Sequence, residues 1–456
     1  MSLINFDKLI EKYDVPCPRY TSYPTVPYWN NQISESTQWE HVLSEQIVKS
    51  IHQEVSIYIH LPFCESLCTY CGCNTRITKN HKVEMPYIRT LLREWELYKA
   101  IFNKKPILKE LHLGGGTPTF FSPQHLHYLL TSLLAEFEIT PDTSMGFEAH
   151  PANTTEEHLH VLYVLGFRKI SIGIQDLDEN VQRIINRKQT FEQIEKLSCK
   201  SRNIGYTCIN YDLIYGLPLQ TIEGVKNTIA RILSLRPDRL AFYSYAHVPW
   251  LKPAQKIFTD EMLPSKTEKR KLYETGRQLF HAAGYFEIGM DHFALPHDEL
   301  YKASICGTLH RNFMGYTPHY SPLLIGLGAS SISDIWTAFM QNHKEVEVYM
   351  EKIHQGNFAI HRSHIHNSQD LYLRKQIQNI MCRYETTFNE DDVSRELQTS
   401  LLKNLEPYQS DELVEIHQNH VKVTDIGKIF LRNICSAFDL RMSEAKNQKV
   451  LFSKAI

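Results

Sequence analysis

The chain has 456 residues, with 42% hydrophobic residues, 22% charged residues and a net charge of −2. This length suggests one large domain with a smaller one, and the balanced charge excludes a general nucleic-acid binder. No apolar run is long enough to span a bilayer, and residues 1–14 lack the apolar core of a signal peptide. We therefore expect a cytoplasmic protein without nucleic-acid or membrane partners, and by default a monomer.

Short apolar strands alternate with helical segments from about residue 54. The predicted strands are 55–62, 108–113, 145–150, 168–176, 208–218 and 239–248. Between the first two, residues 87–102 place their apolar side chains on one helical face. This alternation predicts a parallel sheet with right-handed crossovers, forming a barrel or an open part of one. In such an architecture the functional side chains lie at the C-terminal ends of the strands.

The pattern divides the chain into three predicted parts. Residues 1–50 form an N-terminal extension, 51–340 a barrel domain, and 341–456 a small, mainly helical C-terminal domain. Within the last part, segments 370–388 and 412–438 are predicted to be mainly helical, with one short strand at 420–425. The predicted fold class is α/β, an incomplete (β/α) barrel with these two additions.

Four of the ten cysteines lie in "CESLCTYCGC", residues 64–73, with the spacing C-x3-C-x2-C-x-C. In a reducing compartment such a cluster indicates a metal or redox site rather than disulfides. Structural zinc is one alternative, although its ligands usually form two separated pairs. Thiolates also ligate iron–sulfur clusters, and three of them leave one iron of a 4Fe–4S cluster open. The remaining cysteines are each expected to be small buried residues: Cys17, Cys199, Cys208, Cys306, Cys382 and Cys435.

Polar and glycine residues follow the other predicted strands. "LHLGGGTPT", residues 111–119, is either a tight turn or a stretch of bare backbone that lets a ligand approach closely. Glu148, Gln175 and Asp212 lie in or at the ends of apolar strands, and Arg187 lies in "RIINRKQ". A buried charge requires a partner, so internal ion pairs are the alternative to a binding role, and Arg187 could also lie on a solvated helix.

The triplet Cys64, Cys68 and Cys71, with the aromatic Tyr70 before its last member, resembles the radical S-adenosylmethionine (SAM) superfamily. Nine motifs between residues 18 and 435 also resemble the oxygen-independent coproporphyrinogen III oxidase family. They are "PRYTSYPT", "YIHLPFCESLCTYCGCN", "HLGGGTPT", "GIQD", "DLIYGLP", "YAHVP", "GMDHFALP", "LHRNFMGYT" and "LRNIC". A related haem chaperone shares the triplet, but it typically has an aromatic residue at the position of Cys73 and lacks "PRYTSYPT". An alternative from another class is a non-catalytic, zinc-stapled binding protein.

The resemblance implies a 4Fe–4S cluster on Cys64, Cys68 and Cys71, together with two SAM molecules. Residues expected at the SAM bound to the cluster are Tyr58, Gly115, Glu148 and Ile332. Those expected at the second SAM are Tyr70, Gly116, Thr117, Gln175, Arg187, Asp212 and Ala246. The family often has Phe where this chain has Tyr70.

The activity implied is oxidative decarboxylation of two propionates of coproporphyrinogen III, giving protoporphyrinogen IX for haem biosynthesis. A 5′-deoxyadenosyl radical formed from SAM would start it, with an electron donor such as flavodoxin or ferredoxin. Arginine suits carboxylates, so Arg19 and Arg311 are candidate contacts for the substrate, the alternative being structural ion pairs. Cys73 is a candidate for a role beside the substrate or the second SAM, the alternative being simple packing.

Overall fold

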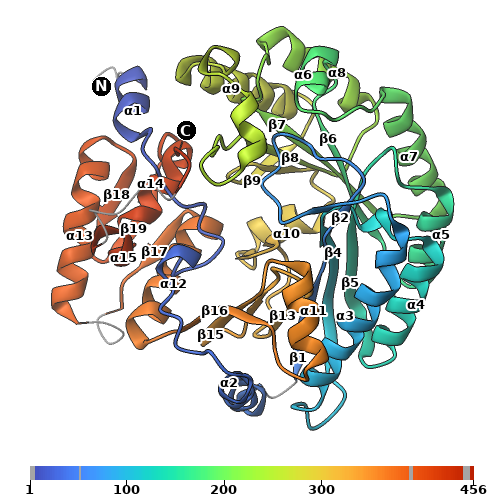
Figure 1. Ribbon diagram of the computed structural model, residues 1–456. Helices are drawn as coiled ribbons and strands as arrows, with labels where there is room; N and C mark the ends of the chain where they lie inside the picture. The colour runs from blue at the N-terminus through green and yellow to red at the C-terminus, as the bar shows by residue number, and fades with distance from the viewer. Residues whose placement is uncertain (1–5, 51–52, 390–393, 445–451, 456) are drawn as a thin grey trace. The chain divides into compact units, whose positions relative to one another are not determined.

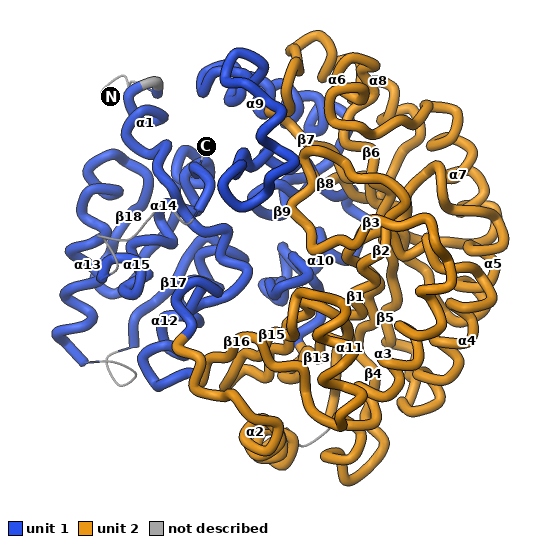
Figure 2. Tube along the Cα trace, viewed as in Figure 1, with its two compact units in different colours: residues 1–29, 242–320, 366–456 blue, residues 30–241, 321–365 orange. Residues whose placement is uncertain are grey.

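The computed structural model describes residues 6–50, 53–389, 394–444 and 452–455. The chain forms two compact units (Figure 2). The barrel unit comprises residues 30–241 and 321–365, and the second unit comprises 1–29, 242–320 and 366–456. The predicted domain boundaries after residues 50 and 340 follow sequence order and remain a prediction. Within the described residues, no helix is both long and apolar enough to cross a membrane.

Parallel strands form the centre of the barrel unit, as the sequence predicts. They are β1 (Glu54–Leu61), β4 (Ile107–Gly115), β5 (Glu138–Ala149), β6 (Lys169–Gln175) and β7 (Cys208–Tyr215), paired in this order. On the other side of β1 the sheet continues through the parallel β13 (Leu324–Leu327). Antiparallel strands complete that edge: β14 (Ile332–Asp334), β15 (Ala338–Asn342) and β16 (Ile360–Ile365). A further strand, β8 (Arg239–Ser244), begins in this unit.

Helices cover the outer side of these strands (Figure 1). They are α3 (Glu84–Lys99), α4 (Pro123–Leu134), α5 (Glu156–Val164), α7 (Phe191–Ile204) and α8 (Ile222–Ser234). The unit also contains α2 (Ser36–Lys49), α6 (Glu179–Ile184), α11 (Val346–His354) and a short parallel pair, β2 (Phe63–Cys64) with β3 (Arg76–Ile77). The helix predicted at 87–102 begins and ends three residues earlier, and it buries the predicted face through Ile88, Leu91 and Trp95.

Two strands extend further than predicted, which affects the site. β5 begins at Glu138 rather than at 145, and β4 continues through Gly114 and Gly115. Leu61 at the end of β1 is the register partner of Gly115. Because these strands are parallel, their C-terminal ends meet at one edge of the sheet.

The second unit is mainly helical. Its helices are α1 (Phe6–Tyr13), α9 (Lys266–Ala282), α10 (Glu299–Ile305), α12 (Ser368–Arg383), α13 (Arg395–Ser410), α14 (Leu431–Ser436) and α15 (Leu440–Glu444). Its strands are β9 (Phe286–Gly289), β10 (His292–Ala294), β11 (His310–Asn312), β12 (Gly315–Thr317), β17 (Glu385–Thr387), β18 (Val414–His417) and β19 (His420–Val423).

The prediction of a mainly helical segment at 412–438 is wrong in its first half. Residues 414–417 form β18, which pairs antiparallel with β19, the strand predicted at 420–425. In β19, buried Val421 and Val423 alternate with the exposed Lys422. This period of two suits a half-buried β-hairpin better than a helix.

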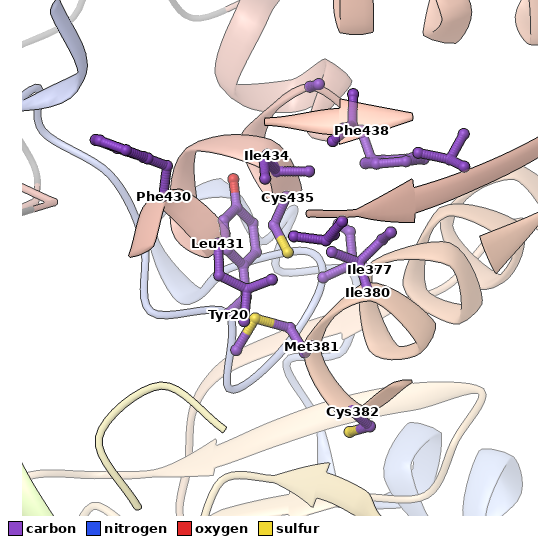
Figure 3. Packing of buried hydrophobic residues seen from close by; sticks show 14 of the residues in the cluster. Tyr20, Ile377, Ile380, Met381, Cys382, Phe430, Leu431, Ile434, Cys435 and Phe438 are labelled. Atoms are coloured by element: carbon purple, nitrogen blue, oxygen red, sulfur yellow. The ribbon is translucent and has the colours of Figure 1, made fainter. Parts of the chain in front are cut away.

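The core of the second unit forms where α14 packs against α12. Figure 3 shows Leu431 and Cys435 of α14 facing Ile380 and Met381 of α12, with Tyr20 of the N-terminal segment beside them. The cysteine prediction holds for Cys17, Cys208, Cys382 and Cys435, which are buried. It is wrong for Cys199 and Cys306, which are exposed. Cys199 lies in α7 between buried Ser198 and half-buried Lys200, and Cys306 follows the last residue of α10.

Candidate functional site

The cysteine loop is anchored to the rest of the barrel unit at its start and at its middle. At the start, the backbone N–H of Gly116 donates to Leu61 O (2.9 Å), and that of Thr117 donates to Phe63 O (3.0 Å). At the middle of the loop, the N–H of Thr69 donates to Ile185 O (3.0 Å). The loop is therefore fixed between the glycine-rich end of β4 and the segment that follows α6.

The three predicted cluster ligands share an environment that differs from that of the fourth cysteine. Cys64, Cys68 and Cys71 are half-buried, whereas Cys73 is exposed. Burial raises the pKa of the Cys64 thiol to about 11, and burial is also the main reason that the pKa of Cys68 is raised. Such thiols become thiolates once a cationic centre binds them.

This donor set fits an iron–sulfur cluster. Among the described residues, no group of three or more His, Cys, Asp or Glu side chains is arranged to hold one metal ion. A 4Fe–4S cluster does not require such convergence, because each thiolate binds a different iron. Three soft sulfur donors from one loop, close to a buried cation, match what such a cluster needs.

That cation is Arg187, whose side chain lies beside the cysteine loop. It is 8% exposed, and its Nη1 lies 3.9 Å from Cys68 Sγ. Its Nη2 donates to Gly173 O (2.5 Å), while its buried Nε has no hydrogen-bond partner in the described part of the chain. Arg187 follows α6 and is not on a solvated helix. Its charge lowers the pKa of Cys68 against the effect of burial, and it retains one donor for an anion.

The structure brings together the four residues expected at the first SAM. Glu148 in β5 accepts a hydrogen bond from the N–H of Gly115 (3.3 Å). A Cβ on the neighbouring Gly114 would lie 2.9 Å from both Glu148 Oε1 and Tyr58 Cε2, so bare backbone is required there. Gly326 is the register partner of Tyr58, and a Cβ on Gly326 would lie 2.6 Å from Ile332 O. Glu148, Gly115 and Tyr58 therefore lie on the adjacent strands β5, β4 and β1, and Ile332 lies on β14, with β13 between it and β1.

Residues expected at the second SAM form a neighbouring group. Asp212 in β7 is the register partner of Gly173, whose carbonyl accepts from Arg187. Ser171 Oγ donates to Asp212 Oδ2 (2.7 Å), and burial raises the pKa of Asp212 to about 6. Gln175, at the end of β6, has a φ of 69°, an uncommon conformation that turns the chain at the strand end.

The other residues of the barrel unit that are expected at the second SAM lie in or next to the cysteine loop. Gly116 and Thr117 follow β4, and Thr117 Oγ1 lies 3.3 Å from Cys64 Sγ. Tyr70 lies in the loop, and a side-chain hydrogen bond from Tyr70 lowers the pKa of Cys68. The hydroxyl that distinguishes Tyr70 from Phe therefore faces the cluster ligands.

Ala246, Arg19 and Arg311 belong to the second unit and are described within it. Arg19 forms an ion pair with Asp291 (3.0 Å) and donates to Ser244 O (2.8 Å), two residues before Ala246. Arg311 is 7% exposed, and its guanidinium lies 4.4 Å from the centre of the Tyr316 ring. Its buried Nε and Nη1 have no hydrogen-bond partner among the residues described. Arg311 therefore has N–H groups that can still donate to a ligand, whereas Arg19 is already engaged in an ion pair.

Two histidines at the strand ends are absent from the predicted site. His60 Nε2 lies 2.8 Å from Asn74 O, and burial lowers the His60 pKa. A Cβ on Gly115 would lie 2.6 Å from His60 Cε1, so this ring lies against the glycine motif. His112 stacks on Tyr58, with 6.3 Å between ring centres, and its Nε2 lies 3.8 Å from Glu148 Oε1. A polar residue within each apolar strand, "YIHLP" and "LHLGG", is the signal that identifies them.

Residues 58–232 match the family model of the radical SAM superfamily. That range contains the cysteine loop, the glycine motif and the polar ends of β5, β6 and β7. The fold and this site define a radical SAM enzyme, an oxidoreductase, and membership of the superfamily implies a 4Fe–4S cluster and SAM.

Individual relatives narrow the class further. The chain is 37% identical over 456 residues to the oxygen-independent coproporphyrinogen III oxidase of Pseudomonas aeruginosa, covering 98% of both chains. It is 34% identical over 453 residues to that of Escherichia coli, again covering 98% of both. A solved structure of coproporphyrinogen III oxidase from Escherichia coli, described as a radical SAM enzyme, matches with a TM-score of 0.89 at 34% identity. That match covers 96% of this chain and 99% of the solved one. The chain belongs to the oxygen-independent coproporphyrinogen III oxidase family, and the predicted fold class is confirmed.

Proposed function

We propose that this protein decarboxylates two propionates of coproporphyrinogen III to vinyl groups without oxygen, giving protoporphyrinogen IX for haem biosynthesis. The observation that carries the proposal is the set of three half-buried cysteines in one loop, beside Arg187 and the Gly115–Glu148 pair. When bound, the cluster and SAM supply an electron and a radical that removes hydrogen from an unactivated C–H bond. We further propose that the protein is a cytoplasmic monomer that receives electrons from flavodoxin or ferredoxin.

In this proposal Cys64, Cys68 and Cys71 hold the cluster, and the neighbouring strand ends hold the first SAM. The bare backbone of the glycine motif lets the amino-acid part of SAM approach the sheet. Glu148 accepts from its ammonium group, and Tyr58 and Ile332 line the remaining sides. The carboxylate of Glu148 already accepts from the N–H of Gly115, which holds it in place.

A second SAM would contact Tyr70, Gly116, Thr117, Gln175, Arg187, Asp212 and Ala246. Arg187 can donate its unused Nε–H to a carboxylate. With a pKa of about 6, Asp212 is ionised at neutral pH and can accept from an ammonium or hydroxyl group. Opposite charges on Arg187 and Asp212, which both adjoin Gly173, suit a zwitterionic amino acid.

The substrate carries four propionates and therefore needs cationic contacts. Arg311 meets this need best, because it is buried with two nitrogen atoms that lack partners in the described part of the chain. Arg19 would contribute its charge while remaining paired with Asp291. We assign Cys73 a role beside the substrate or the second SAM.

The activity test is an anaerobic assay of the reconstituted protein with coproporphyrinogen III, SAM and a reductant. Protoporphyrin fluorescence, read after oxidation of the products, should appear only when both SAM and reductant are present. Product formed in air without SAM would contradict the proposal. SAM cleavage that leaves coproporphyrinogen III unchanged would favour the haem-chaperone alternative.

The four cysteines are tested one by one by substitution with serine. Cys64→Ser, Cys68→Ser and Cys71→Ser should each lose the 4Fe–4S cluster, whereas Cys73→Ser should keep it and lose most of its decarboxylation. Iron and sulfide analysis, absorbance and activity measure this. Normal activity in Cys73→Ser would assign the residue to packing, and loss of its cluster would mean that all four cysteines are ligands.

A further inference from the structure

Two large apolar side chains and several basic ones are exposed in the cysteine loop and in the segments bonded to it. Leu67 and Ile77 are large hydrophobic residues that are 41% and 40% exposed. Exposed basic residues come from the same loop region and from the segment around the end of α6. We call this surface the loop face; its members are Leu67, Ile77, Lys79, Lys82, Arg183 and Lys188.

The two apolar residues lie next to the proposed cluster ligands. In the β2–β3 pair Ile77 is the register partner of Cys64, and the N–H of Thr78 donates to Cys64 O (2.9 Å). Leu67 directly precedes Cys68, and its carbonyl accepts from Asn186 Nδ2 (2.7 Å). That bond joins the loop to the segment carrying Arg183 and Lys188. A partner bound to Leu67 and Ile77 would therefore be separated from the cluster by little more than the cysteine loop itself.

The charge of this face is opposite in sign to the net charge of the chain. Residues 64–83 contain Arg76, Lys79 and Lys82 against a single acidic residue, Glu65. Arg76 is engaged by Glu347 (2.9 Å), which leaves Lys79 and Lys82 against the exposed Glu65 in this segment. Across the Asn186 link, Arg183 and Lys188 add two exposed positive charges against the exposed Glu179 of α6. The face keeps a positive excess, while the whole chain carries −2.

We propose that the loop face is the docking site for a small acidic protein that carries one electron, such as a flavodoxin. The inference rests on the proposed function, because that reaction draws electrons from outside the protein. In this transfer the reduced flavin of the carrier would lose one electron, and the cluster would gain that electron. An apolar centre with a charged rim is the usual anatomy of a protein interface, and charges of opposite sign speed the encounter.

The test compares the double variant Lys79→Glu/Lys82→Glu with a matched control, Lys104→Glu/Lys105→Glu. The control pair is exposed in the same unit and precedes the start of β4, at the opposite end of that strand from the glycine motif. Two readouts are used: affinity for oxidised flavodoxin, and the rate at which flavodoxin hydroquinone bleaches the cluster absorbance. At low ionic strength the loop-face variant should lose roughly tenfold or more in the second-order rate constant, and should bind correspondingly weakly. The wild-type rate should fall with added salt more steeply than the variant rate.

Reduction by dithionite, a small reductant that needs no docking face, should be the same in all three proteins. Unchanged flavodoxin binding and reduction in the loop-face variant would overturn the proposal, as would an equal loss in the control. An equal loss with dithionite would also overturn it, because the lysines would then support the cluster itself. These readouts need no porphyrin, so a protein that passes them yet never decarboxylates coproporphyrinogen III would refute only the proposed function.

Discussion

Glu94 is a buried carboxylate in α3 that holds the turn leading to Ile332. One of its oxygens accepts from the N–H of Gly328 (2.8 Å) and from the Tyr349 hydroxyl (2.6 Å). The other accepts from Asn342 Nδ2 (2.5 Å). In the described part of the chain no Lys, Arg or His pairs with Glu94. Burial therefore prevails over these hydrogen bonds and raises the Glu94 pKa from 4.5 to about 7.

We predict that Glu94→Gln changes the pH dependence of stability. The folded-state pKa of this acid lies above its unfolded value, so the wild-type protein gains most from a neutral Glu94 below pH 4.5. That contribution is lost as the pH rises from 4.5 to about 7. At about 1.4 kcal/mol per pKa unit, the loss between about pH 5 and about pH 8 is on the order of 2–3 kcal/mol. Glutamine does not titrate, so the variant should gain by this amount relative to wild type over the same interval.

Thermal unfolding of both proteins at about pH 5 and about pH 8 measures the effect. The difference in melting temperature should shift in favour of Glu94→Gln by roughly 2–3 °C at the higher pH, because the entropy of unfolding of a chain of this length is large. Glu96→Gln, an exposed position on the same helix, is the matched control and should show no such shift. An equal gap between Glu94→Gln and wild type at both pH values would refute the reasoning.

Four further predictions concern the site. Gly116→Ala should lose cluster occupancy and roughly 1–3 kcal/mol of stability, because the added Cβ would lie 2.7 Å from the Pro62 backbone. The control is Gly72→Ala, whose added Cβ would have no atom within 4 Å, and which should retain its iron content. SAM binding at the second site should weaken as the pH falls through about 6, because Asp212 then takes up a proton. In Asp212→Asn, SAM binding should be weak at every pH. A SAM affinity of this variant that still changes with pH would contradict the prediction. Arg311→Ala should raise the substrate KM roughly tenfold or more with iron content unchanged, since a charge-assisted hydrogen bond contributes about 1.5–3 kcal/mol. Arg19→Ala should also raise KM and lower stability through loss of the Asp291 ion pair, and two unchanged KM values would refute both substrate assignments.

The parts of the site that could be predicted from the sequence are local. The cysteine loop is one continuous stretch, and Glu148 and Gln175 follow apolar strands whose parallel order brings their ends to one edge. The role of Glu94 could not be predicted, because its partners lie more than 230 residues away along the chain. The same holds for Gly326, which becomes the register partner of Tyr58 only once β13 pairs with β1.

Short-range sequence patterns also gave a wrong secondary structure where one segment can form either a helix or a strand. Residues 412–438 mix charged and apolar residues in a way that fits a helix, and pairing with β19 decides the outcome for β18. A buried carboxylate raises a similar problem. Glu84 is 1% exposed and lies 2.6 Å from both His81 Nδ1 and His125 Nδ1, a network that no spacing rule identifies. Tertiary contacts, not propensity, determine both results.

We propose that Cys73 is not a cluster ligand, which would leave one iron of the cluster open. The stretch from Cys64 to Cys71 is anchored to the end of β4 and to the segment after α6. Beyond Gly72 the anchors change, because Asn74 Nδ2 donates to Lys344 O (2.8 Å) and Asn74 O contacts His60 Nε2. The charge of Cys73 acts on the pKa of both Tyr58 and Tyr70, one residue from each SAM group. This placement favours a role for Cys73 beside the bound cofactors over ligation of the fourth iron, and Cys73→Ser distinguishes the two.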